Sequence, residues 1–119
     1  DAKSMGAFYI GFSGREPLCN PDVIAIIKAA KSLGYRVGII RNGQLLHDEL
    51  ITQLIKLQLA RISISFHGYR PETYSKHFNV DQHYYEQVLQ STQKLINGGA
   101  NVGIAYTVTK YNINVMQQI

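Results

Sequence analysis

Short apolar runs alternate along the chain with longer stretches in which apolar residues recur every three or four positions. The short runs predict buried strands at residues 7–12, 36–41, 61–66 and 102–108. The longer stretches predict helices that begin near Asn20, Asp48 and Asp81 and end near Gly34, Leu57 and Gly98. The polar residues 67–80 read as a loop. Strands that alternate with helices over short connections predict a parallel α/β sheet with right-handed crossovers.

The carboxyl ends of the predicted strands carry polar or glycine-rich stretches. These stretches are residues 13–16, 42–43, 65–68 and 107–109. Ligands of parallel α/β folds bind at this edge of the sheet. Turns need the same residue types in any sheet, so the strand ends alone leave a binding role and a structural role about equally open.

Alternation along the last two predicted strands separates their side chains into two faces. Small or polar residues share one face of each strand: Ser63, Ser65 and His67, and Gly103, Ala105, Thr107 and Thr109. A parallel sheet that is covered on both sides normally carries large apolar residues on both faces. The pattern favours a ligand-binding face over a face that helices approach closely.

Composition narrows the class of protein. The chain has 119 residues, 45% of them hydrophobic and 17% charged, which suits one domain or part of one. The net charge of +4 is spread along the sequence, which is typical of solvated helix faces rather than of a nucleic-acid surface. No apolar run reaches the ~20 residues that a membrane helix needs. Neither a nucleic-acid nor a membrane partner is expected.

Cysteine and histidine usage argues against a metal site within this sequence. Cys19 is the only cysteine, so it cannot form an internal disulfide or a multi-cysteine metal site, and the chain is expected to be cytoplasmic. The four histidines show no ligand spacing. We expect no metal ligand and no catalytic residue here.

Five stretches of the chain resemble a known family. Residues 12–22, FSGREPLCNPD, resemble the Gly-Gly-Glu-Pro stretch of radical S-adenosylmethionine (SAM) enzymes. The others match in the same order: LGYRV at 33–37, IRNGQLL at 40–46, ISISFHG at 62–68 and YTVTKYN at 106–112. Five ordered matches across nearly the whole chain are far more specific than one. Within the superfamily, the chain resembles the branch that includes peptide-modifying and sulfatase-maturating members.

The resemblance implies a partial TIM-like barrel. Residues 1–119 would be one partial radical SAM domain, the second to fifth strands of a (β/α)6 barrel with three to four helices, a fragment that lacks the first and last strands. In the family, three cysteines after the first strand hold a 4Fe–4S cluster, and SAM chelates the fourth iron. Reduction cleaves SAM to a 5′-deoxyadenosyl radical, which abstracts a hydrogen atom from the substrate. The partners implied are SAM, an unknown substrate such as a peptide or protein, and the rest of the barrel.

The resemblance also implies which residues bind SAM. Those implied are Gly14, Arg15, Glu16, Asn42, Ser65 and Thr107, and strand alternation adds Ser63 to them. The stretch 14–16 would hold the SAM amino group, since backbone carbonyls and the Glu16 carboxylate accept hydrogen bonds from an ammonium. Ser65 would bind the ribose or the carboxylate. His67 is either a substrate contact or a loop residue.

Three positions depart from the family pattern. Arg15 replaces the second glycine of the motif, where a long cation close to the SAM ammonium is unfavourable unless it points outward. Arg41 replaces a threonine before Asn42, and His67 replaces an aspartate after Ser65. Cys19 aligns with an apolar position and is expected to pack rather than to bind a cluster.

With one cysteine, the chain cannot build a three-cysteine cluster by itself. We therefore predict no radical chemistry from this chain alone; iron and sulfide reconstitution that yields a stoichiometric 4Fe–4S spectrum would contradict this. One alternative is a non-catalytic binding module derived from a degenerate barrel. Another is a doubly wound nucleotide-binding domain, against which the absence of Gly-x-Gly-x-x-Gly and P-loop motifs argues. Exposed sheet edges predict a homodimer.

Overall fold

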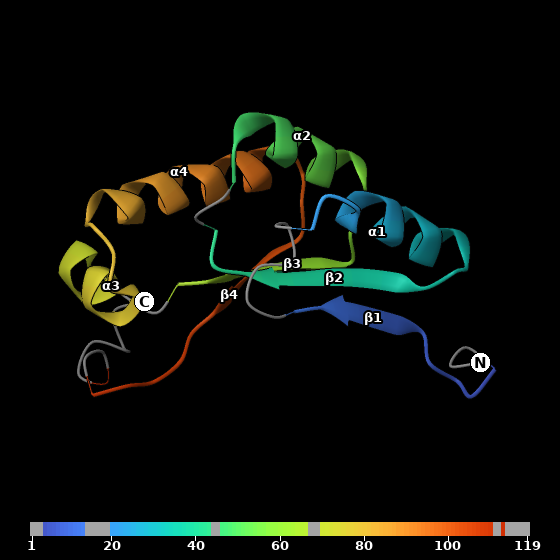
Figure 1. Ribbon diagram of the computed structural model, residues 1–119, viewed down its shortest axis with the longest axis horizontal. Coiled ribbons are helices and arrows are strands. Elements are labelled where there is room, and N and C mark those ends of the chain that lie inside the picture. The colour runs from blue at the N-terminus through green and yellow to red at the C-terminus, as the bar shows by residue number, and fades with distance from the viewer. Residues whose placement is uncertain (1–3, 14–19, 44–45, 67–69, 111–112, 114–119) are drawn as a thin grey trace.

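The computed structural model describes residues 4–13, 20–43, 46–66, 70–110 and 113, and these form one parallel sheet with helices packed on it (Figure 1). The elements in chain order are β1 (Tyr9–Phe12), α1 (Val23–Ser32), β2 (Arg36–Arg41), α2 (Asp48–Lys56), β3 (Arg61–Ser65), α3 (Pro71–Phe78), α4 (His83–Asn97) and β4 (Val102–Ala105). The four expected strands are therefore present. β1 begins two residues later than expected and β4 ends three residues earlier.

The strand order explains why the helices share one side of the sheet. The strands lie side by side in the order β1-β2-β3-β4, and each pairs in parallel with the next. Right-handed crossovers between consecutive neighbours place every connecting helix on the same face. Figure 1 shows α1, α2 and α4 over that face. A doubly wound sheet reverses its strand order and carries helices on both faces, so the alternative of a doubly wound domain is wrong for the described elements.

The hydrophobic core lies between this face and the helices. Ile39, Ile62 and Ile64 of the sheet are fully buried. One side chain from each covering helix meets them: Ile27 of α1, Leu54 of α2 and Leu95 of α4. Burying each such side chain contributes about 1.5–3 kcal/mol, so this layer is the main source of stability in the described part of the chain.

The buried helix faces are narrower than the periodicity predicts. Ile26 and Leu33 fall at helical spacing on the same side as the buried Val23, Ile27 and Ala30 but are 42% and 63% exposed. Leu89 and Ile96 of α4 are similarly exposed. Each helix packs on the sheet from one side, so only the line of residues nearest the strands becomes buried.

The helix ends follow the expected signals with small shifts. α1 begins at Val23, after a turn in which the Asn20 side chain accepts a hydrogen bond of 2.9 Å from the Asp22 backbone N–H. Gly34 follows α1 with a φ of +88°, the left-handed conformation expected of it. At α2 the N-cap is His47 rather than Asp48, because His47 Nδ1 accepts from the Leu50 N–H at 3.3 Å.

The segment expected to be a loop contains a helix, α3. Pro71 is its first residue, and Asn79 ends it in the left-handed conformation with a φ of +53°. Tyr74 is fully buried, with its ring centroid 4.7 Å from that of Phe78 and 5.5 Å from that of Phe66. This aromatic contact docks α3 beside the end of β3, so Tyr74 belongs to the core rather than to its edge.

Candidate functional site

No described helix covers the second face of the sheet, which we call the open face (Figure 1). The register pairs Ser63 with Gly103 and Ser65 with Ala105. Register partners of a parallel pair lie on the same face, and the alternate residues Ile62 and Ile64 are buried beneath the helices. Ser63, Ser65, Gly103 and Ala105 therefore lie together on the open face, as the alternation predicts.

Glycines on the open face leave room that longer side chains occupy. A Cβ placed on Gly38 would lie 2.8 Å from Cζ of Tyr9, so the Tyr9 ring extends across this glycine. A Cβ placed on Gly103 would lie 2.7 Å from Cζ of Arg61, whose guanidinium covers that glycine. Tyr9 and Arg61 both lie at the amino ends of their strands, and sequence reasoning did not select either as a site residue.

At the carboxyl edge of the sheet, two of the predicted SAM-binding residues are neighbours. Arg41 pairs with Ile64, so Asn42 and Ser65, which follow them, lie side by side, and both are half-buried. Thr107 is exposed, two residues beyond the end of β4. The remaining predicted residues, Gly14, Arg15, Glu16 and His67, lie outside the described residues, as does Cys19.

Arg41, one of the three departures from the family pattern, is directed away from the open face. It is 2% exposed and alternates with Asn42, so its side chain lies on the helix-covered side. Gly43 follows with a φ of +80°, close to the Val88 side chain of α4. The cation at position 41 therefore does not intrude on the surface that carries Asn42 and Ser65.

The described ionisable groups do not build a metal site. Across residues 4–13, 20–43, 46–66, 70–110 and 113, no three His, Cys, Asp or Glu side chains gather as metal ligands would. Near the end of β4, burial raises the pKa of the Tyr106 hydroxyl. No described helix is long and apolar enough to cross a bilayer.

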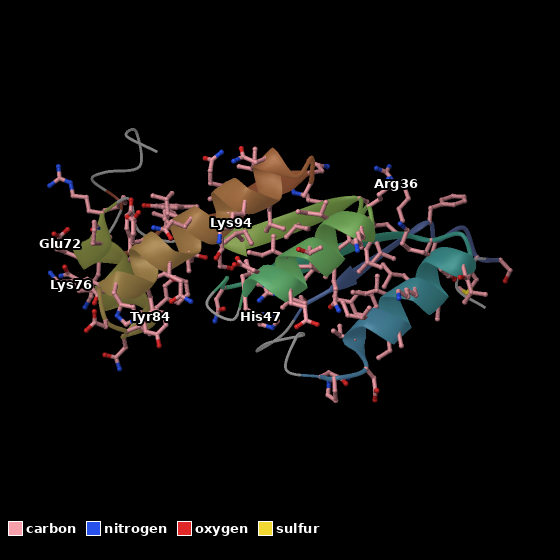
Figure 2. All side chains as sticks on the ribbon, turned by 90° about the horizontal axis from the view of Figure 1, so that it is seen from above. Arg36, His47, Glu72, Lys76, Tyr84 and Lys94 are labelled. Carbon is pink, nitrogen blue, oxygen red and sulfur yellow. The ribbon has the colours of Figure 1, made fainter. Side chains whose placement is uncertain are left out.

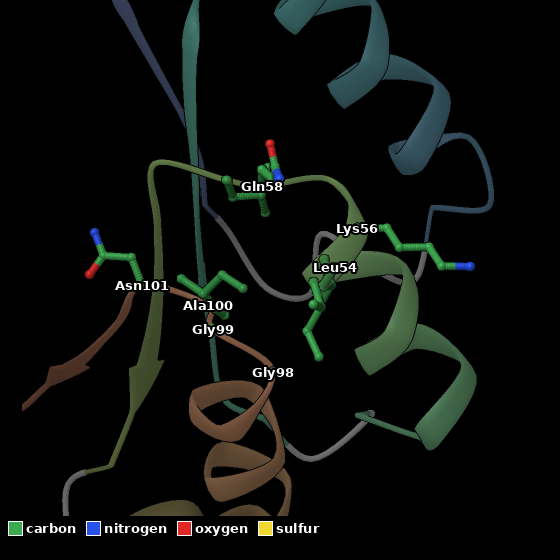
Figure 3. A pocket seen from close by; sticks show the side chains of 10 residues that line it. Leu54, Lys56, Gln58, Gly98, Gly99, Ala100 and Asn101 are labelled. Atoms are coloured by element: carbon green, nitrogen blue, oxygen red, sulfur yellow. The ribbon is translucent and has the colours of Figure 1, made fainter.

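A cavity among the described residues lies at the opposite end of the sheet. It has a volume of about 470 Å³ and lies between the C-terminal ends of α2 and α4, beside the start of β3 and β4 (Figure 3). Its described lining includes Leu54, Gln58, Gly99 and Asn101, and Lys56 is its charged member, pointing away from the others in Figure 3. Apart from Lys56, this lining offers no ionisable group, hydroxyl or thiol, so the open face is the better candidate site.

A family model decides the identity of the domain. The model of the radical SAM superfamily matches residues 1–118. The chain belongs to the radical SAM superfamily.

Curated relatives agree with this assignment. A probable GTP 3′,8-cyclase of Methanothermobacter marburgensis is 34% identical over 99 residues, which cover 82% of this chain and 32% of the relative. A probable GTP 3′,8-cyclase of Saccharolobus islandicus is 33% identical over 113 residues, which cover 93% of this chain and 36% of the relative. The chain thus spans about a third of the length of these relatives. Their names are not those of peptide-modifying or sulfatase-maturating enzymes.

Solved structures show the same fold. SuiB of Streptococcus suis superposes with a TM-score of 0.79 at 19% identity, covering 92% of this chain and 25% of that one. A domain of pyruvate-formate lyase-activating enzyme from Bacteroides vulgatus superposes with a TM-score of 0.71 at 17% identity, covering 87% of this chain and 61% of that one. The described strands and helices therefore have the fold of a partial TIM-like barrel, as expected. The superfamily match and the curated relatives support the main interpretation, a radical SAM domain, rather than the alternatives.

The open face carries hydrogen-bonding groups of the kinds that could hold SAM, whereas the sequence has one cysteine. The Ser63 and Ser65 hydroxyls and the Asn42 amide can each donate or accept hydrogen bonds with ribose, amino or carboxylate groups. Ala105, the register partner of Ser65, is small and leaves space for a ligand beside it, whereas the Arg61 guanidinium lies over Gly103. A 4Fe–4S cluster of the family needs three cysteines and the sequence has one, so the cluster ligands do not come from these residues.

Proposed function

We propose that the open face of this chain binds SAM within a radical SAM enzyme. The observation that carries the proposal is the grouping of Ser65 and Asn42 at the carboxyl edge of the open face, with Ser63 on the same face and Ala105 beside Ser65. Hydroxyl and amide groups at the carboxyl edge of a parallel sheet suit a ligand rich in hydrogen-bonding groups. The family match over residues 1–118 supports SAM as that ligand.

The residues of this chain bind and orient SAM. Ser65 and Asn42 provide adjacent donors and acceptors for its ribose or carboxylate, Ser63 lies one step deeper on the same face, and Thr107 approaches from the end of β4. By resemblance, Gly14, Arg15 and Glu16 hold the amino group. When bound beside a reduced 4Fe–4S cluster, SAM would supply the hydrogen-abstracting radical of the family, and this chain's residues would hold and orient it.

The substrate is proposed from the relatives. The two curated relatives described above are named probable GTP 3′,8-cyclase, so GTP is the first substrate to test in the full-length protein. A peptide or protein substrate, which the motif resemblance suggested, is the second. Consumption of GTP without change in a peptide supports the first; the reverse supports the second. In either case we propose that the chain works together with the rest of the barrel and that the protein is cytoplasmic.

Ser65→Ala tests SAM binding. Loss of one hydrogen bond of about 1–1.5 kcal/mol is expected to weaken SAM binding by about 5–10-fold. Isothermal titration with SAM measures the affinity. Ser75→Ala is the matched control, because Ser75 is also half-buried but lies in α3, where its hydroxyl donates to the Val80 carbonyl. Equal SAM affinities in wild type and Ser65→Ala would contradict the proposal.

A further inference from the structure

Arg61 places a cation in the middle of the open face. It is the first residue of β3 and pairs with Gly38 on β2, so its side chain starts on the open face. Its guanidinium lies over Gly103 on the other neighbouring strand. Gly103 is the register partner of Ser63. The guanidinium therefore reaches the level of the Ser63 hydroxyl, close to the edge where Ser65 and Asn42 lie.

The glycine at position 103 is what permits this arrangement. Any side chain there would begin within 2.7 Å of the guanidinium carbon, closer than van der Waals contact allows. With glycine, the flat guanidinium rests on the backbone of β4 while its outer surface faces solvent. Arg61 is exposed, so its donors are accessible from the open face.

Nothing in the described part of the chain neutralises this cation. The described carboxylates all lie in helices or in the residues just before them: Asp22, Asp48, Glu49, Glu72, Asp81 and Glu86. The described ion pairs involve His83 and Lys94 and not Arg61. Arg36, the register partner of Tyr9, adds a second positive charge at the amino end of the same face. Within the described residues, the open face is positive and has no acidic counterpart.

We propose that Arg61 binds an anionic group, a phosphate or a carboxylate, of the molecule that occupies the open face. The inference rests on the proposed function, which makes this face the ligand-binding surface. The planar guanidinium presents paired N–H donors that match two oxygens of a phosphate or carboxylate. The Ser63 hydroxyl, two residues further along β3 and in register with Gly103, adds a donor at the same level. Arg61 thereby orients the charged end of the ligand toward the middle of the sheet.

The simplest test uses pyrophosphate as the anion. A saturable change in the Arg61 Nε–H chemical shift is expected when sodium pyrophosphate is added at constant ionic strength. Arg61→Gln is expected to reduce pyrophosphate affinity by about tenfold or more, the loss of a charge-assisted contact. Arg61→Lys keeps the charge but not the paired donors, so its pyrophosphate affinity is expected to lie between those of wild type and Arg61→Gln. Lys76→Gln, which removes a positive charge at an exposed position of α3, is the matched control.

Gly103→Ala tests the same site without changing charge. The added methyl would displace the guanidinium, so pyrophosphate affinity is expected to fall while the net charge stays constant. A non-saturable shift, or equal pyrophosphate affinity in wild type and Arg61→Gln, would overturn the proposal. So would equal weakening by Arg61→Gln and Lys76→Gln, because that result would reflect overall charge alone.

Two pairs of ligands identify the source of the anion. If it is the SAM carboxylate, Arg61→Gln weakens binding of SAM but not of decarboxylated SAM. If it is a substrate phosphate, Arg61→Gln weakens binding of GTP but not of guanosine. Suppose that Ser65→Ala weakens SAM binding but Arg61→Gln changes the affinity of neither SAM nor GTP. This result refutes the role of Arg61 and leaves the proposed function unaffected. Pyrophosphate binding at Arg61 without any SAM binding refutes the proposed function instead.

Discussion

Two glycines with the same backbone conformation make different demands on the structure. Gly43 and Gly99 have φ values of +80° and +85°. A Cβ on Gly43 would lie 2.9 Å from the Val88 side chain and 3.3 Å from that of Ile64, whereas a Cβ on Gly99 would meet nothing within 4 Å. Backbone strain is therefore common to both positions, and steric conflict is specific to Gly43.

Gly99→Ala is expected to lower the free energy of unfolding by about 1–2 kcal/mol, the cost of a left-handed conformation. Gly43→Ala is expected to cost at least about 1 kcal/mol more, because the methyl also overpacks the core beneath α4. Urea denaturation of the two variants measures the difference. Equal losses would mean that α4 moves aside without cost and that the loop after β2 is not held against it.

Residue chemistry alone predicts part of the candidate site. The period of two along β3 and β4 places Ser63, Ser65, Gly103 and Ala105 on one face, and the register bears this out. The position of the Arg61 guanidinium over Gly103 depends instead on which residues of two strands, more than forty positions apart, become neighbours. The packing of the whole sheet sets that register, so no local pattern reveals it.

At the scale of elements, an ion pair joins α2 to α4. Lys94 Nζ donates to the Asp48 carboxylate at 2.7 Å. Figure 2 labels Lys94 on α4 and His47, the residue just before Asp48. The hydrogen bond from Lys94, followed by its charge, lowers the pKa of Asp48. Because this pKa is lower in the folded state, the pair stabilises the protein above the unfolded-state pKa. The contribution is lost as the pH falls through the folded-state pKa.

Lys94→Gln is expected to raise the pKa of Asp48 toward its ordinary value, which carboxyl carbon chemical shifts measure as a function of pH. Any stability difference between wild type and Lys94→Gln should shrink below about pH 4, where an unperturbed Asp becomes protonated. Asp81 is the internal control, since the His83 backbone and side chain lower its pKa. An unchanged Asp48 titration would show that the pair does not persist in solution.

Elements with strong local signals are the ones that the sequence predicts well. β2 has the bounds that its apolar run indicates, and α2 buries Leu50, Ile51 and Leu54 as the periodicity requires. The periodicity does not reveal α3, because the helix is short and its buried residue Tyr74 packs on side chains of the flanking segments, Phe66 after β3 and Tyr85 of α4. Pro71 at its start and Asn79 at its left-handed end are the local signals that could have revealed it.

At the scale of the whole molecule, the outer strands of the described sheet leave backbone edges unpaired. β1 and β4 each have one neighbouring strand in the described part of the chain. Unpaired N–H and C=O groups along an edge strand favour pairing with another chain. Large apolar side chains lie near both edges, since Tyr9 on β1 and Ile104 on β4 are exposed. The predicted homodimer would bury such an edge.

Ile104→Lys is expected to weaken that dimer. Ile104 is 46% exposed on the outer strand β4, and a lysine on an edge strand opposes pairing because two like charges would be brought together. Light scattering across a concentration series measures the dimer fraction in both proteins. Leu33→Lys is the matched control, because it adds the same charge at an exposed apolar position at the end of α1, away from the sheet edges. A wild-type protein that stays monomeric at high concentration would refute the dimer. Loss of the dimer in Ile104→Lys but not in Leu33→Lys would place the contact at the β4 edge.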